Sequence, residues 1–484
     1  MTLLTKRDFL AVLSLVMVIG AAYWATLQPG QDWGGDFGQY INHARNIAEG
    51  RPYLQPRYEV TLPTAARHMP PSYPPVFPLL LAPVYARFGL NLTPMKIEVQ
   101  ILFLLAALAY YLVGRLRGLG PLAASIASGA LALSGLVLAM KDHVLSDSTY
   151  LLFVGVTLSA MLLIERHKWD ERKPVAAGLL LAILMLLAYG TRAIGGALAI
   201  AFVLHELLVK RRIRLFALIV LGGFAAGVLA LTITLYDSRA YGDEFVFLPK
   251  VYLDNALFYL RSPAALWTGA PGAVRYLFFA ITGIVVAAHW IRRMLTRPTV
   301  VEFQDLVIGC TVIVMTAGAD ARYLIPFFAM YFVYFLEGIE ALRGRFRTSS
   351  WLPVAACGLL AVGVVFNLRG IDKHPYQEDV EQPQFMELRD FLRREVDPQA
   401  LVISRSPRVL ALYTDRRSAW YPETSDDGVF NAYLDRVGAG YVLVHIPQVE
   451  DQQWLEPHID HDPADYSAVF RNAGFVLYRR ISSP

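Results

Sequence analysis

A carboxylate stands at the start of a predicted amphipathic helix in the segment QDWGGDFGQYINHARNIAEGRPY. Apolar residues recur at helical spacing over residues 37–48, and Gly50 and Pro52 are stop signals. Asp36 precedes the first turn, where a carboxylate can cap free backbone N–H groups. It can equally act as a general base that accepts a proton from a hydroxyl. The two roles are compatible, and Asp32 is a weaker candidate for the second.

Two arginines lie at the ends of apolar segments, Arg192 in YGTRAIGG and Arg322 in DARYLIP. A guanidinium matches phosphate oxygens in a bidentate manner. Arginine at a helix end more commonly extends to lipid headgroups. Because neither belongs to a basic cluster, we predict that both bind phosphate. Tyr323, next to Arg322, is a candidate for the headgroup region or for substrate binding.

Further polar candidates lie in the turn KDHVLSD and in a proline-rich stretch. Lys141 and His143 could bind phosphate or transfer a proton, although a solvated interfacial loop explains them equally well. Asp147 closes the same turn. The six prolines of PPSYPPVFPLLLAPVYARFGL preclude a regular spanning helix. Such a broken segment usually lines a cavity, so its Tyr73 is a candidate contact with substrate.

The elements that must position these residues are membrane helices. The 484-residue chain is 55% hydrophobic and 17% charged, with a net charge of +4 and a mean hydropathy of +0.42. This apolar content requires a lipid solvent, and the scattered basic residues argue against nucleic-acid binding. We predict about eleven transmembrane segments of roughly 20 residues each. They centre near residues 18, 105, 130, 156, 182, 201, 225, 281, 310, 332 and 360.

Basic clusters follow every second predicted crossing, from KR at Lys6 to RGRFR at Arg343. By the positive-inside rule these clusters face the cytoplasm, so the N-terminus is cytoplasmic and the candidate residues lie on the outer face. An odd number of crossings places the C-terminus outside. We therefore predict a transmembrane domain over 1–368 and an extracytoplasmic domain over 369–484. In the latter, helical patterns alternate with ALVIS, GYVLVHI and GFVLYRR, which predicts a small α/β fold with a supporting or acceptor-binding role.

Several stretches together resemble the GT-C superfamily of polyprenyl-phosphate-sugar-dependent glycosyltransferases, especially protein O-mannosyltransferases and lipid A aminoarabinose transferases. The stretches are GDFGQYINHARNIAEGRPY, SYPPVFPLLLAPVYARFGL, SDSTYLLF, YGTRAIGGALA and ARYLIPFFAMYF, in this order along the membrane region. The family's essential aspartate maps to Asp36, and its second acidic position to Asp147, with Asp142 in reserve. Many members have two adjacent acidic residues at the first position, whereas here Asp36 is followed by Phe37.

The resemblance implies transfer of a sugar from a polyprenyl-phosphate donor to a hydroxyl of a cell-envelope glycan, lipid or protein. Asp36 would be the base, Arg192 and Arg322 would bind the donor phosphate, and Asp147 would orient the acceptor, bind a sugar hydroxyl or share a metal. Any Mg²⁺ or Mn²⁺ would rest on carboxylates, since zinc-type ligand spacing is absent from the sequence. The expected location is the bacterial cytoplasmic membrane. The alternatives are a transporter or flippase, since helices broken by Pro and Gly also suit alternating access, and a non-catalytic membrane scaffold whose exported domain binds a partner.

Overall fold

The computed structural model describes residues 5–54, 58–63, 69–234, 248–315, 319–346, 351–371, 376 and 379–481. The chain forms two compact units. The first comprises Met1–Gln28, Lys96–Thr234 and Glu244–Lys373, and the second comprises Pro29–Met95, Leu235–Asp243 and His374–Pro484. A domain boundary between residues 368 and 369 stays a prediction. The predicted outer loop over residues 237–270 begins outside the described residues, which resume at residue 248.

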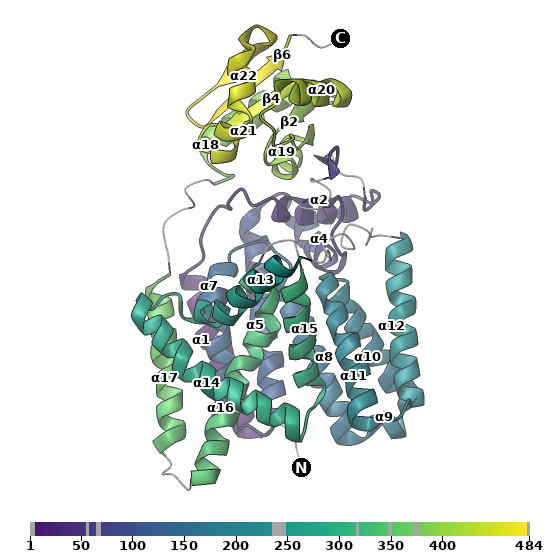
Figure 1. Ribbon diagram of the computed structural model, residues 1–484, viewed down its shortest axis with the longest axis vertical. Helices are drawn as coiled ribbons and strands as arrows, with labels where there is room; N and C mark the ends of the chain where they lie inside the picture. Colours follow the sequence, from purple (N-terminus) through teal and green to yellow (C-terminus); the bar gives the residue numbers. More distant parts are fainter. Residues whose placement is uncertain are drawn as a thin grey trace. The chain divides into compact units, whose positions relative to one another are not determined.

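All regular elements among the described residues of the first unit are helices (Figure 1). Its elements are α1 (Lys6–Ala25), α5 (Leu92–Leu116, from Lys96 on), α6 (Pro121–Ala132), α7 (Gly135–Met140), α8 (Asp147–His167), α9 (Trp169–Arg172), α10 (Pro174–Tyr189), η1 (Ala193–Gly196), α11 (Ala197–His205), η2 (Glu206–Lys210), α12 (Leu215–Thr234), α13 (Pro249–Arg261), η4 (Ser262–Trp267), α14 (Gly272–Thr296), α15 (Val300–Val314), η5 (Ala321–Leu324), α16 (Ile325–Phe346) and α17 (Trp351–Arg369).

Every centre predicted from hydropathy falls within one of these helices. Among the described residues, eight helical runs are long and apolar enough to cross a membrane: α1, α5, α8, α12, α14, α17, Ala193–Lys210 and Ala321–Arg345. The other three predicted segments correspond to α6, α10 and α15, which are shorter, at 12, 16 and 15 residues. The chain is therefore a polytopic α-helical membrane protein, as predicted.

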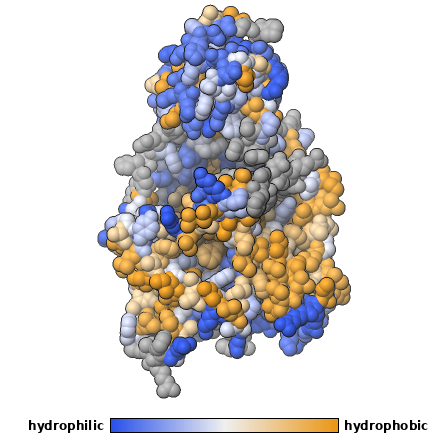
Figure 2. Space-filling view, in the orientation of Figure 1, coloured by the Kyte–Doolittle hydropathy of each residue, from blue (hydrophilic) through white to orange (hydrophobic). Residues whose placement is uncertain are grey.

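The outward faces of these helices are apolar. Leu180, Ile183, Ile200 and Leu218 are about half exposed, although side chains of this type are normally buried in water-soluble proteins. Figure 2 shows the corresponding hydrophobic surface over α10, α11 and α12. Such a surface is stable only when lipid covers it, which agrees with the lengths of the helices.

The second unit combines the segment after the first helix with the C-terminal segment. Its elements are α2 (Asp36–Ala48), β1 (Tyr58–Glu59), α4 (Val76–Phe88), α18 (Pro383–Glu395), β2 (Leu401–Ile403), α19 (Pro407–Thr414), β3 (Arg417–Ala419), α20 (Asp427–Val437), β4 (Ala439–His445), α21 (Val449–Trp454), α22 (Glu456–His461), η6 (Pro463–Asp465), β5 (Tyr466–Arg471) and β6 (Phe475–Arg480).

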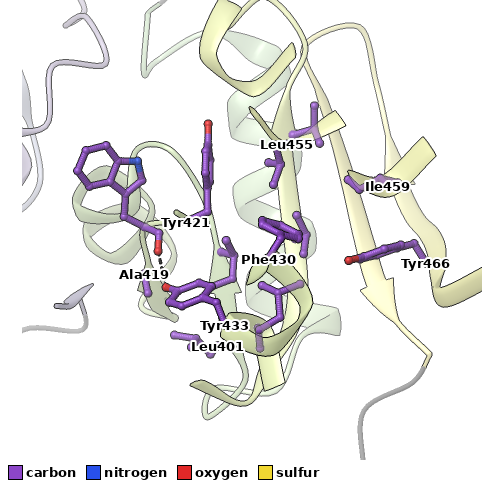
Figure 3. Close-up of a cluster of buried hydrophobic side chains, with 14 of the residues drawn as sticks. Leu401, Ala419, Tyr421, Phe430, Tyr433, Leu455, Ile459 and Tyr466 are labelled. Carbon is purple, nitrogen blue, oxygen red and sulfur yellow. Dashed lines mark hydrogen bonds between the residues drawn. The ribbon is translucent and has the colours of Figure 1, made fainter. Parts of the chain in front are cut away.

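The strands form one sheet in the order β1-β3-β2-β4-β6-β5. The first four are parallel to one another, and β6 is antiparallel to both of its neighbours, β4 and β5. The predicted α/β domain is thus confirmed, and its predicted strands are β2, β4 and β6. Its core packs aromatic and branched side chains from both sheet and helices (Figure 3), where the hydroxyl of Tyr433 donates a hydrogen bond to the carbonyl oxygen of Trp420. The edge strand β1 was not predicted, because two residues carry no periodic pattern.

The amphipathic helix predicted after the first apolar segment is α2, and it ends before Gly50, which has a positive φ of 66°. It packs against α4 and α19. Contact with α19 is close because Gly38 has no side chain: a Cβ there would lie 3.3 Å from the backbone of Arg408. The proline-rich stretch forms the 13-residue α4 with Pro83 inside, a helix too short to span a bilayer, as expected from its prolines.

The strand-like segment that leads into α2 is anchored at Gly30. This residue has φ +71°, and the backbone N–H of Gln31 donates a hydrogen bond to Asp379 Oδ1 at 2.8 Å. The backbone N–H of Val380 in turn donates to the Gln31 carbonyl at 3.0 Å. A Cβ on Gly30 would lie 1.9 Å from Asp379 Oδ2, so both the conformation and the space require glycine.

Replacing Gly30 with alanine should lower the free energy of unfolding by about 2 kcal/mol, from left-handed backbone strain and from displacement of Asp379. Thermal unfolding of the purified protein in detergent measures this. The control is Gly20→Ala, in the interior of α1, where the added methyl meets nothing within 4 Å. Equal midpoints for the two variants would contradict the role assigned to Gly30.

Candidate functional site

Asp36 is the first residue of α2, and Gly35 is the residue that caps the helix. The hydroxyl of Tyr73 donates a hydrogen bond to Asp36 Oδ1 at 2.6 Å, and Arg408 Nη1 lies 3.2 Å from the same oxygen. The side chain of Asp36 is 43% exposed. Among the described residues Oδ2 makes no hydrogen bond. The carboxylate is therefore held by side chains through one oxygen, while the other remains available to a ligand.

Arg408, on α19, supplies the positive charge at this site and is fully buried. Its Nη1 donates to the Tyr73 hydroxyl at 2.8 Å, and its Nη2 donates to the carbonyl oxygen of Pro70 at 2.7 Å. The guanidinium also lies over the rings of Tyr58 and Tyr73, 5.4 and 5.0 Å from their centroids. Burial alone would lower the pKa of Arg408, but Tyr73 and Asp36 raise it above its usual value.

Tyr73 is itself fixed by a second layer of contacts. Its ring stacks on Tyr40 at 4.6 Å, and its carbonyl oxygen accepts a hydrogen bond from the Tyr53 hydroxyl at 2.6 Å. His43 Nε2 accepts from the Tyr73 backbone N–H at 3.3 Å, while Nδ1 lies 3.0 Å from the Tyr53 carbonyl oxygen, to which it donates. Burial lowers the pKa of His43 to about 3, so the ring is neutral near pH 7.

A cleft of 380 Å³ opens beside these residues within the second unit. It is lined by Asp32, Trp33, Gly34, Gly35, Met69, Arg405, Ser406, Arg408 and Gln448. Gly35 is the chain neighbour of Asp36 and Arg408 is its ion-pair partner, so the cleft adjoins the candidate base.

In the first unit, four of the predicted residues meet near the N-terminus of α8. Arg192 Nη1 forms an ion pair with Asp147 Oδ1, and Arg322 Nη1 lies 3.9 Å from Asp147 Oδ2. Arg322 Nε also donates to Asp320 Oδ2 at 2.6 Å, and the Arg192 guanidinium lies 5.3 Å from the centroid of the Tyr323 ring. The structure thus brings Asp147, Arg192, Arg322 and Tyr323 together.

This cluster has the composition of an anion site with its own counter-ion. The Asp147 side chain is only 2% exposed, whereas Arg192 and Arg322 are 18% and 26% exposed, so the arginines are the accessible members. The buried hydroxyls of Ser148 and Thr149 have no hydrogen-bond partner among the described residues. Free backbone N–H groups at the start of α8 add to the positive potential there.

Lys141 makes its contacts away from this cluster. Lys141 is fully buried, forms an ion pair with Asp142 and donates to the carbonyl oxygen of Thr26 at 2.7 Å. Asp142 also accepts from Gln100 Nε2 at 2.8 Å. These contacts join the end of α1 to the turn before α8. A role of Lys141 or His143 in substrate binding stays a prediction.

A site for Mg²⁺ or Mn²⁺ would require a group of carboxylates, because both ions favour oxygen ligands. In the part of the chain that the structure describes, no three His, Cys, Asp or Glu side chains gather as a group that could hold a metal ion. A divalent-metal requirement stays a prediction.

The helical membrane region and the mixed α/β sheet together define a polytopic membrane protein with a polar appended unit. This arrangement is similar in fold to the GT-C glycosyltransferases. It is similar to ArnT from Cupriavidus metallidurans, solved bound to undecaprenyl phosphate, with a TM-score of 0.61, 12% identity and 98% of each chain covered. An oligosaccharyltransferase from Archaeoglobus fulgidus, solved with a tethered acceptor peptide, gives a TM-score of 0.62 at 12% identity, over 99% of this chain and 74% of its own.

The arabinofuranosyltransferase AftD from Mycobacteria gives a TM-score of 0.53 at 14% identity, over 98% of this chain and 42% of its own. No model of a known protein family matches the sequence, and none of the curated proteins matches it. The likeness to known proteins is therefore one of fold, at an identity too low to transfer residue roles.

Sequence reasoning selected Asp36 and Tyr73 separately and missed Arg408, which links them. Arg408 is 372 residues from Asp36 along the chain. The only local signal was a pair of arginines in SRSPRVL after a predicted strand, in a domain assigned a supporting or acceptor-binding role. Buried ion pairs of this separation leave no periodic pattern.

The two acidic partners of Arg322 should differ in their effect on stability. Asp147→Asn removes a buried counter-ion and should lower the free energy of unfolding by roughly 3 kcal/mol. Asp320 is 37% exposed, so Asp320→Asn should cost less than about 1 kcal/mol. Denaturant titration in detergent would show the difference, and a larger loss from Asp320→Asn would be inconsistent with the buried pair.

Acid should destabilise the second unit through His43. The folded pKa of about 3 lies below the ordinary value of 6.5, so the unfolded chain binds a proton first as the pH falls. Stability is retained above pH 6.5 and should fall by about 1.4 kcal/mol per pH unit below it. Unfolding midpoints at pH 7.5 and 5.0 should therefore differ more for the wild type than for His43→Gln. An identical pH dependence in both proteins would refute this.

Proposed function

We propose that the chain is a membrane glycosyltransferase that moves a sugar from a polyprenyl-phosphate donor to a hydroxyl group of an acceptor. The observation that carries the proposal is Asp36, a half-exposed carboxylate held through one oxygen by a tyrosine and a buried arginine beside a cleft. The GT-C fold supports it, because ArnT, the oligosaccharyltransferase and AftD are transferases and the solved ArnT holds undecaprenyl phosphate.

Asp36 acts as the general base in this proposal. Tyr73 and Arg408 fix its carboxylate through Oδ1, so Oδ2 can accept the proton of an acceptor hydroxyl. Fixing the base in advance removes part of the entropic cost of reaching the transition state. The exposure of Asp36 allows a substrate to reach it, which a fully buried structural carboxylate would prevent.

Arg192 and Arg322 bind the donor phosphate. Both are partly exposed and held close to one buried carboxylate, which limits their motion. Phosphate oxygens can accept hydrogen bonds from such guanidinium groups, and charge that develops on the leaving phosphate is stabilised by them. Asp147 keeps the arginines in place, and Tyr323 packs under Arg192.

The reaction is a single displacement. The acceptor oxygen forms a bond to the anomeric carbon as its proton passes to Asp36, and the bond between that carbon and the phosphate oxygen breaks. The electron pair of the broken bond leaves with polyprenyl phosphate, and the configuration at the anomeric carbon is inverted. One base suffices for this route, whereas a retaining route requires a second, nucleophilic carboxylate.

The proposed location is the bacterial cytoplasmic membrane, with the N-terminus in the cytoplasm and the second unit outside. The partners are a lipid-linked sugar, membrane lipids and a glycan, lipid or protein acceptor of the cell envelope. The alternation of basic clusters between predicted crossings supports this orientation.

Release of free polyprenyl phosphate from a panel of polyprenyl-phosphate sugars, in the presence of mixed envelope acceptors, tests the function. Asp36→Asn should reduce the rate by about 10²- to 10⁴-fold, since it removes a general base. Asp415→Asn is the matched control, because Asp415 is an arginine-paired aspartate of the same unit with 38% exposure, and it should retain the wild-type rate.

Equal release by the wild type and Asp36→Asn would contradict the role of Asp36. Release by neither, with every donor and acceptor, would contradict the function and favour the transporter or scaffold alternatives.

A further inference from the structure

The cleft beside Asp36 has walls that identify the kind of molecule it can hold. Its volume of 380 Å³ is within the range of about 300–1,000 Å³ typical of small-molecule sites. Apart from Trp33 and Met69, its lining side chains are polar or charged. This mixed lining suits a small ligand that has both polar groups and an apolar face.

The cations of the cleft are already neutralised. Arg405 Nη1 pairs with Glu423 at 2.5 Å, and its Nη2 lies 3.6 Å from Glu450. Arg408 pairs with Asp36, and Asp32 adds a further negative charge to the wall. These four carboxylates outnumber the two arginines, so the net charge around the cleft is negative. The cleft therefore favours an uncharged polar ligand over an acidic one.

Trp33 gives the cleft a rigid aromatic wall. Its ring meets Phe385 edge-on at 4.6 Å and lies against His445 and Phe475 at 5.2 and 5.7 Å. A ring held by three others loses little freedom when a ligand packs on it. The C–H face of a sugar ring carries partial positive charge that complements the negative face of an indole.

Side chains that can form hydrogen bonds line the cleft beside Trp33. Ser406 lines the cleft with its hydroxyl-bearing side chain. It is the residue before α19 and makes no side-chain cap, so its hydroxyl is not needed by the helix. Asp32 and Gln448 line the cleft as well, which together gives both donors and acceptors for sugar hydroxyls.

We propose that this cleft is the acceptor subsite and that it binds an uncharged saccharide, stacked on Trp33 with one hydroxyl directed to Asp36. The inference rests on the proposed function and narrows its acceptor to a glycan. Trp33 and Ser406 are binding residues in it, and Asp36 remains the base.

The test uses the full-length protein in detergent and methyl glycosides of mannose, glucose and galactose as probes. Saturation-transfer NMR should show binding to the wild type and its loss in Ser406→Phe, whose larger side chain occupies part of the cleft. Ser425→Phe, at an exposed serine of the same unit, is the matched control and should bind as the wild type does.

A kinetic test follows with whichever glycoside accepts sugar. Trp33→Ala should raise the KM for the glycoside by about tenfold, which corresponds to about 1.4 kcal/mol of lost binding, while the KM for the donor stays within about twofold. Trp33→Phe, which keeps an aromatic ring, should recover most of the affinity. Trp169→Ala, a tryptophan substitution in the first unit, should leave both KM values unchanged.

The possible results distinguish failure of the proposed acceptor subsite from failure of the proposed glycosyltransferase function. If the wild type turns over no donor, the proposed glycosyltransferase function is contradicted. The NMR measurement alone then decides whether the cleft binds a saccharide. Binding of glycosides that survives Ser406→Phe overturns the subsite, as does an acceptor KM that is unchanged in Trp33→Ala. Transfer to a serine- or threonine-containing peptide without glycoside binding overturns it too, in favour of a protein acceptor.

Discussion

The ion pair between Arg408 and Asp36 is the contact on which the second unit depends. A buried guanidinium is costly unless its charge and its N–H groups are matched, and Arg408 has no exposure to water. Its partners all come from the segment between the first two apolar helices: the Asp36 carboxylate, the Pro70 carbonyl and the Tyr73 hydroxyl. That segment and the C-terminal α/β fold are therefore one unit, in which β1 also joins the C-terminal sheet.

The same contact explains how a surface carboxylate can be both ordered and reactive. A solvated aspartate would sample several rotamers, whereas Asp36 is fixed through one oxygen and stays 43% exposed through the rest. His43, Tyr40 and Tyr53 hold Tyr73, so the order extends from the core of the unit to its surface. The cluster of Asp147 with Arg192 and Arg322 applies the same principle in the first unit, where a buried carboxylate orders two accessible cations.

Much of the fold was predictable because it follows from periodicity and hydropathy. Apolar length located the membrane helices, helical spacing located α2, and alternating patterns located β2, β4 and β6. The candidate site was predictable only in part. A polar residue type beside a local pattern identifies Asp36, Tyr73, Arg192 and Arg322. In contrast, the pairing of both arginines with Asp147 and the position of Arg408 beside Asp36 depend on tertiary packing. Strand β1 and the cleft also arise from segments that are distant in sequence.

Chemical rescue tests most directly whether Asp36 is the base. In Asp36→Ala the carboxylate is removed while Arg408 and Tyr73 remain, which leaves a positively charged position that a small carboxylate such as formate can occupy. The account predicts that Asp36→Ala binds donor normally, transfers sugar at a rate reduced by about 10²-fold or more, and regains activity as formate concentration rises. Transfer by Asp36→Ala at the wild-type rate without formate would contradict it.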